Sequence, residues 1–205
     1  MPLTPQQAAE RPYFVTLCRT GSVPASARAD LALARGEAAA PAPGAAEPAA
    51  WLPAFQRIDA TLNAAATGPR DLSTPAVAQG LFDSFDWLRE RGWRIWAGCI
   101  MPSHLHLVLQ NTKGRNALLT SDLGLFESYT GRMANRVLGR EGAFWQRETC
   151  LDHECRASED WLDYVRLTAR NPVDARLVKA WRAWRWTVVD PELEPAVPES
   201  NTPGA

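Results

Sequence analysis

Two β-prone runs lie side by side in the middle of this chain, Trp93–Met101 (WRIWAGCIM) and His104–Gln110 (HLHLVLQ). Only Pro102 and Ser103 separate them, and residues of this kind are typical of a tight turn. Strands joined by so short a connection pair with each other as an antiparallel hairpin. The chain is therefore expected to contain a β-hairpin near the middle of its sequence.

Further elements precede the hairpin. Tyr13–Cys18 (YFVTLC) alternates and is rich in β-formers, which predicts a first strand. Residues 21–50 are rich in alanine and proline and favour a loop with a short helix. Trp51–Ala65 shows helical spacing of its apolar residues. Another helix is expected to begin at Pro75 and to end near Gly92.

Helices are also predicted after the hairpin. A long amphipathic one should run from about Ala117 or Leu123 to Leu138 and end at Gly139. Residues 143–157 are interpreted as a connecting segment. A last helix should begin at Ser158 and be interrupted at Pro172, because proline lacks the backbone donor that a helix interior requires.

This order of elements predicts the α+β class, with a ferredoxin-like antiparallel sheet and helices on one face of it. The 205 residues fit one domain. We expect it to span residues 1–192, with residues 21–50 as an insertion. The proline-rich residues 193–205 are expected to form a disordered tail.

Composition excludes some classes of protein without selecting one. The 46% hydrophobic and 22% charged residues are ordinary for a globular protein, and there is neither a membrane-length apolar run nor a secretory signal, so we expect a cytoplasmic protein. The net charge of −1 does not indicate a nucleic-acid partner. Basic residues do recur on predicted helices, at Arg132, Arg136, Arg140, Arg147, Arg156, Arg166, Arg170, Arg176, Lys179, Arg182 and Arg185. They fit either a phosphate-binding face or ordinary solvated helices.

Two of the three histidines, His104 and His106, occupy alternate positions of one predicted strand. Alternate side chains point to the same face, here the face opposite the row of Leu105, Leu107 and Leu109. Two aligned imidazoles can supply two ligands to one metal ion, or they can simply hydrogen-bond to backbone. A zinc site at Cys150, His153 and Cys155 is a weaker interpretation, because no fourth ligand is evident.

The segment WAGCIMPSHLHLVLQ around these histidines resembles the histidine-bearing strand of REP-associated tyrosine transposases, with Ser103 where that family often has asparagine. These proteins belong to the bacterial HUH superfamily of single-strand DNA transposases. The resemblance extends in order over about Tyr13 to Trp186, with an insertion after the first strand. Further matches are Phe14–Leu17, Leu72–Pro75, Phe144–Glu148 (FWQRE), Asp152–His153 with Arg156, Asn171–Pro172–Val173 and Leu177–Val178.

The resemblance implies a function and a site. Members bind single-stranded or hairpin DNA, hold Mg²⁺ or Mn²⁺ between the two histidines and an amide, and cleave and rejoin a DNA strand through a tyrosine. His104 and His106 match the histidine pair, and Asn171 matches the amide. The tyrosine would stand four residues before that amide, where this chain has Leu167.

Tyr164, one helical turn before Leu167, is the candidate for a relocated nucleophile, and packing at a helix boundary is the alternative. Three functions remain open from the sequence. The first is a metal-dependent DNA transposase or nuclease. The second is a catalytically impaired protein that only binds hairpin DNA, and the third is a metal phosphoesterase that uses water. The protein is expected to be a monomer or a homodimer without a membrane partner.

Overall fold

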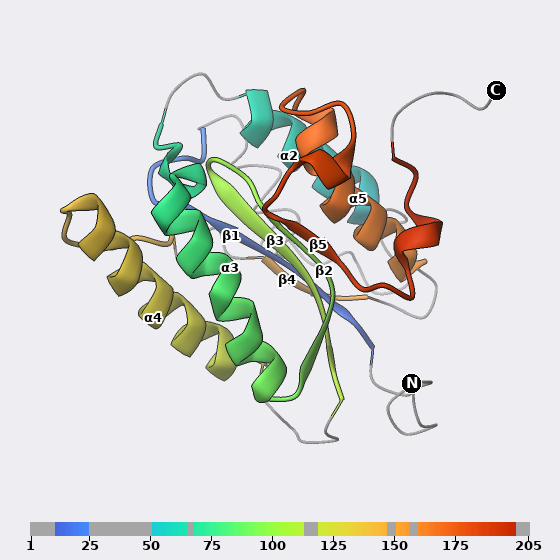
Figure 1. Cartoon of the computed structure of the whole chain (residues 1–205), viewed down its shortest axis with the longest axis horizontal. Coiled ribbons are helices and arrows are strands. Elements are labelled where there is room, and N and C mark those ends of the chain that lie inside the picture. The colour runs from blue at the N-terminus through green and yellow to red at the C-terminus, as the bar shows by residue number, and fades with distance from the viewer. Residues whose placement is uncertain are drawn as a thin grey trace, which may run out of the picture.

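A single antiparallel sheet forms the centre of the protein (Figure 1). The computed structural model describes residues 11–24, 51–64, 68–112, 119–146, 151–155 and 160–199. Five strands lie in the order β4-β1-β3-β2-β5. They are β1 (Tyr13–Cys18), β2 (Trp93–Ile100), β3 (His104–Asn111), β4 (Leu151–Glu154) and β5 (Thr187–Val189). The predicted central hairpin is therefore β2–β3, and β3 lies in the middle of the sheet.

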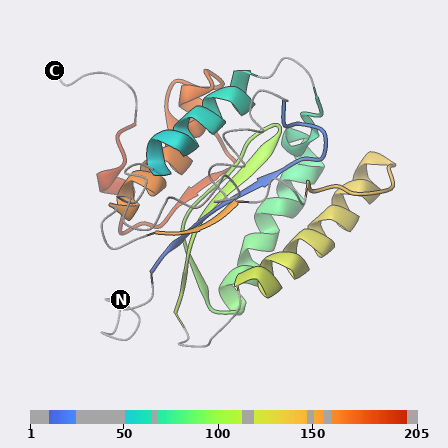
Figure 2. The ribbon, with the colours of Figure 1, turned by 180° about the vertical axis from the view of Figure 1, so that it is seen from behind.

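In the described part of the chain, α-helices cover both faces of this sheet (Figures 1 and 2). On one face are α3 (Pro75–Glu90) and α4 (Leu119–Leu138), and on the other are α2 (Trp51–Ala64) and α5 (Trp161–Asp174). The elements β1, α3, β2, β3, α4 and β4 follow the ferredoxin-like order. The α+β class and the antiparallel sheet are confirmed. The sequence predicted helices on one face of the sheet. The structure has a second helical layer, formed by α2 and α5, on the other face.

The second helical layer follows from the burial of β3, all eight of whose residues are buried. The row formed by Leu105, Leu107 and Leu109 packs in one core with α3 and α4. Val108, in the row of the histidines, packs in the other core with α2 and α5. A strand with two buried faces needs a covering layer on each, because its apolar surface would otherwise remain in water.

Two local expectations about the C-terminal half are corrected. Pro172 lies inside α5, which continues to Asp174. In the last helical turn the proline removes only one possible backbone bond, to Thr168, so the helix need not end there. The segment predicted to be a connection contains β4, whose four residues are too few and too polar to show a strand pattern. Its pairing with β1 makes it a strand.

The expected insertion and tail lie largely beyond the described residues. Of the insertion, residues 25–50 are outside them. Of the predicted disordered tail, residues 193–199 are described, and they include a short helical turn, η4 (Glu194–Ala196), and the buried Val197. Among the described residues, no helix combines the length and the apolar character needed to cross a membrane.

Candidate metal centre

His104 and His106 are buried beneath α2 and α5, on the side of the sheet that their alternation predicts. Each ring is held by its Nδ1 atom. The Nδ1 of His104 lies 3.1 Å from Ser103 Oγ, and the Nδ1 of His106 lies 2.9 Å from Thr16 Oγ1. Hydroxyl groups bonded to Nδ1 orient an imidazole so that its other nitrogen, Nε2, is available to a ligand.

Asp59, from α2, brings a carboxylate to the two free ring nitrogens. Its Oδ1 atom lies 2.9 Å from Nε2 of His106 and 4.0 Å from Nε2 of His104. All three side chains are buried, and their ligand atoms lie within 4.8 Å of one another. Two atoms that bind one ion at a right angle, each at about 2.1 Å, are about 3.0 Å apart. The 2.9 Å separation of Asp59 and His106 therefore matches two ligands of one divalent ion, and the 4.0 Å separation of Asp59 and His104 is below the roughly 4.2 Å between ligands on opposite sides of an ion.

The protonation of His104 favours the same conclusion. Burial lowers the pKa of His104 well below its usual 6.5, and the nearby His106 and Arg70 lower it further. A hydrogen bond with Asn171 acts in the opposite direction. Both Nε2 atoms are buried, and the Asp59 carboxylate that they face can only accept hydrogen bonds. A neutral imidazole whose Nδ1–H is bonded to a hydroxyl presents a lone pair at Nε2, and a cation relieves the repulsion between this pair and a carboxylate.

Asn171 is adjacent to the centre, where it orients the Asp59 carboxylate. Its Nδ2 donates to Asp59 Oδ2 at 2.5 Å, and its Oδ1 accepts from Asn63 Nδ2 at 3.0 Å. A polar chain thus runs from Asn63 through Asn171 and Asp59 to His106. These contacts do not test whether Asn171 itself binds metal, which stays a prediction.

The sequence patterns did not identify Asp59 as a site residue, although its position in α2 indicates one. The apolar stripe of α2 includes Phe55, Ile58 and Leu62, all of them buried. Position 59 follows Phe55 by one helical turn and precedes Leu62 by another, so it lies on the same buried face. A carboxylate is rarely buried without a partner, and its place in an apolar stripe indicates a site.

Tyr164 and Leu167 occupy different surroundings on α5. Tyr164 is 1% exposed and packs among aromatic rings, with centroid distances of 5.2 Å to Phe14, 5.8 Å to Phe55 and 5.6 Å to His153. Leu167 is half-buried and lines a cleft together with Asp59 and Asn171. The leucine, and not the tyrosine, shares this cleft with the candidate metal centre.

The alternative zinc site receives no support from the described part of the chain. His153 packs against Phe55 and Tyr164, and Cys155 is a buried free thiol. Cys150 lies outside the described residues. Within them, the group of Asp59, His104 and His106 is where metal-ligating side chains converge.

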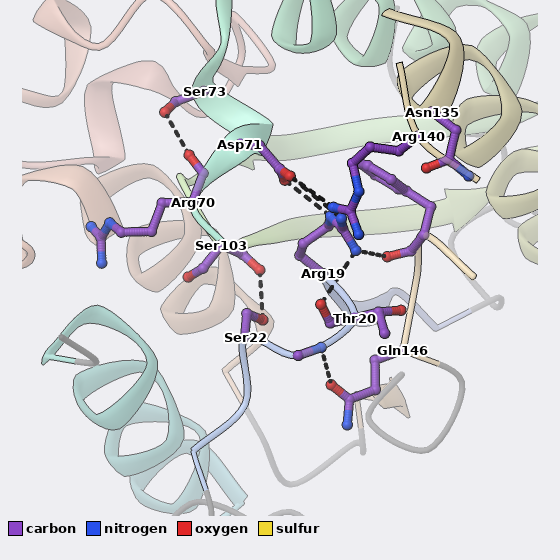
Figure 3. Close-up of polar contacts among 12 residues, drawn as sticks. Arg19, Thr20, Ser22, Arg70, Asp71, Ser73, Ser103, Asn135, Arg140 and Gln146 are labelled. Atoms are coloured by element: carbon purple, nitrogen blue, oxygen red, sulfur yellow. Dashed lines mark hydrogen bonds and ion pairs between the residues drawn. The ribbon is translucent and has the colours of Figure 1, made fainter. Parts of the chain in front are cut away.

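A buried arginine supports the turn that leads into the histidine strand (Figure 3). Arg19 Nε donates to Asp71 Oδ1 at 3.0 Å, and its Nη1 donates to the carbonyl of Phe144 at 3.0 Å. The backbone N–H of Arg19 donates to the carbonyl of Ser103, as does the hydroxyl of Ser22. These contacts hold Ser103, and through it the His104 ring, at the end of β1.

The lowered pKa of His104 makes stability depend on pH. The unfolded chain takes up a proton near pH 6.5, whereas the folded chain takes it up only at lower pH. Without metal, the free energy of unfolding should therefore fall as the pH drops below 6.5, by up to about 1.4 kcal/mol per pH unit from this group. Urea titrations in chelator at several pH values measure this slope. His104→Asn should show a smaller slope between pH 6.5 and 5, and equal slopes would contradict the assignment.

Fold and site together define a class of protein: a ferredoxin-like α+β domain with a His-x-His pair on its central strand. No family model matches the sequence, and no curated protein matches it. Among solved structures, this chain is similar to a REP-associated tyrosine transposase bound to a REP hairpin. The two structures superpose with a TM-score of 0.52 at 13% sequence identity, over 95% of this chain and 86% of the other. At this identity the similarity establishes a shared fold.

Proposed function

We propose that this protein binds single-stranded or hairpin DNA and holds a divalent metal, Mg²⁺ or Mn²⁺, at Asp59, His104 and His106. The observation that carries the proposal is the convergence of two anchored imidazoles and one carboxylate at a buried point beside a cleft. The structural neighbour, described as bound to a REP hairpin, supports DNA as the partner. When bound, a divalent ion would polarise the oxygens of a DNA phosphate and orient the strand.

The surface of α4 offers groups suited to a DNA backbone. Arg132 and Arg136 on α4 and Arg140 just after it recur every four residues and are exposed, and Tyr129 on α4 is 61% exposed. Arginines attract phosphates, and an exposed aromatic ring can stack on an unpaired base. This local arrangement supports DNA binding despite the net charge of −1.

The residues near the centre favour weak covalent catalysis. Leu167 faces the cleft at the position that carries the tyrosine in the resembling family, and it has no hydroxyl. Tyr164 is enclosed by aromatic rings, and attack requires reacting atoms within about 3–3.5 Å. We therefore propose hairpin binding with impaired strand cleavage as the leading form of the function. Cleavage and rejoining through Tyr164 and water-dependent hydrolysis at the metal are its alternatives. A cytoplasmic location and a monomeric or homodimeric state complete the proposal.

Substituting Leu167 by tyrosine tests this function. The new phenol would enter the cleft that Asp59 and Asn171 line, so Leu167→Tyr should form a covalent DNA adduct with Mn²⁺ where wild type forms little or none. Adducts are measured on denaturing gels with palindromic oligonucleotides that carry single-stranded flanks, and native gels report binding by wild type.

Matched variants separate the alternatives. Leu167→Phe adds the same ring without the hydroxyl and should give no adduct. A strong wild-type adduct that Tyr164→Phe abolishes would establish Tyr164 as the nucleophile and contradict impaired cleavage. Cleaved DNA without any adduct would identify a phosphoesterase that uses water, and absence of DNA binding would refute the proposal.

A further inference from the structure

A cleft of about 520 Å³ lies between α2 and α5 and borders the metal centre. Two of its lining residues, Asp59 and Asn171, also belong to the metal centre or support it. Three of its ten described lining residues are alanines, whose small side chains leave space in the cleft. Ala60 and Ala64 lie one turn apart on α2, and Ala175 adjoins the end of α5. Its volume is in the range of pockets that hold small organic groups.

The lining combines apolar surface with neutral hydrogen-bonding groups. The alanines and Leu167 provide apolar surface, on which a flat ring can lie. Gln56 and Asn63 provide side-chain amides, each with both donors and an acceptor. Asn63 uses one donor towards Asn171. The ligand that fits such a lining is a flat, neutral group whose edge also carries both donors and acceptors.

The charged side chains of the cleft do not form a cluster of cations suited to a phosphate. Asp59 and Asp174 are acidic, whereas Arg176 is the single cationic side chain among the lining residues. Asp174 also forms an ion pair with Arg170 at 3.5 Å. Because Asp59 faces the metal centre and Asp174 is paired with Arg170, the exposed Arg176 alone is left to attract a phosphate, whereas the amides and the apolar surface of the lining suit a neutral nucleobase.

The end of α5 determines where Arg176 lies relative to the cleft. Arg176 has a φ of 58°, and among the described residues it is the one non-glycine residue with a positive φ. Its backbone N–H donates to the carbonyl of Val173 and that of Leu177 donates to the carbonyl of Pro172, so the left-handed residue ends α5 in a Schellman motif. Arg176 comes two positions after the end of α5, and this turn of the chain places it at the cleft.

We propose that this cleft takes one unpaired nucleobase of a DNA strand whose neighbouring phosphate lies at the metal centre. The inference rests on the proposed function and adds a specific subsite to it. Bases in single strands can be splayed from their neighbours, stacked on a protein surface and read at their edges by amides. The loss of one stacked base should weaken binding by about 10-fold.

The test uses the full chain with Mn²⁺ and a hairpin oligonucleotide with a single-stranded flank. A series of oligonucleotides carries one abasic site at each flank position in turn, and fluorescence anisotropy gives each Kd. Wild type should lose about 10-fold in affinity at one position. Ala60→Trp, which fills the cleft from an exposed position, should bind the intact oligonucleotide about 10-fold more weakly and be insensitive to the abasic site there. Ala76→Trp, at an exposed position on α3, should behave as wild type.

Two readouts separate the cleft from the proposed function. Calorimetry should give Ala60→Trp the same Mn²⁺ affinity as wild type. Saturation-transfer NMR with free deoxynucleosides should show binding to wild type that Ala60→Trp lacks. Absent Mn²⁺ or hairpin binding by wild type would refute the proposed function, and the deoxynucleoside result would still decide on the cleft. Two results would overturn the subsite. One is a wild-type protein whose Kd changes at no abasic position and that binds no deoxynucleoside. The other is an Ala60→Trp variant with unchanged DNA affinity.

Discussion

Replacing both His104 and His106 with alanine is expected to lower Mn²⁺ affinity by more than about 100-fold. Mutation of residues that only orient metal ligands typically lowers metal affinity 10- to 100-fold. This variant removes two of the three proposed ligands themselves. Isothermal titration calorimetry measures the change, and circular dichroism checks that the fold persists. Asp59→Asn should also weaken binding, because it keeps the size of the side chain and removes its charge.

The third histidine provides the matched control. His153 packs against Phe55 and Tyr164 and is not a member of the candidate metal centre. His153→Ala should therefore bind Mn²⁺ as wild type does. Unchanged affinity in the double variant, or an equal loss in His153→Ala, would show that Mn²⁺ binds elsewhere.

Arg19→Ala is expected to lower the free energy of unfolding by about 3–5 kcal/mol, the usual effect of removing one partner from a buried ion pair. The Arg19 side chain is fully buried, and the Asp71 side chain is 22% exposed. Among the described residues, the substitution leaves Asp71 with the exposed Arg140 as its one ionic partner, and it takes a donor from the carbonyl of Phe144. Urea unfolding of both proteins measures the difference.

An exposed arginine serves as the control for this loss. Arg89 pairs with Asp86 on the surface of α3, and their side chains are 42% and 74% exposed. Such pairs contribute about 0–1 kcal/mol, so Arg89→Ala should leave stability nearly unchanged. If Arg19→Ala cost as little as Arg89→Ala, Arg19 would not support the turn before β3.

The sequence predicted the parts of this structure that depend on local periodicity. Alternation identified β1 and the hairpin, and helical spacing located α2, α3 and α4 to within a few residues. The same alternation placed His104 and His106 on one side of their strand. Such patterns succeed because side-chain direction repeats every two residues in a strand and every 3.6 in a helix.

Tertiary packing decided what meets the histidine face. Asp59 lies about 45 residues before the histidines, and only the docking of α2 through Phe55, Ile58 and Leu62 brings its carboxylate to them. The same layer encloses Tyr164 and leaves Leu167 at the cleft, and pairing with β1 makes a strand of Leu151–Glu154. A sequence pattern shows which face of an element is apolar. Which other element covers that face depends on contacts distant in the chain, and for this reason the metal centre emerged only from the folded structure.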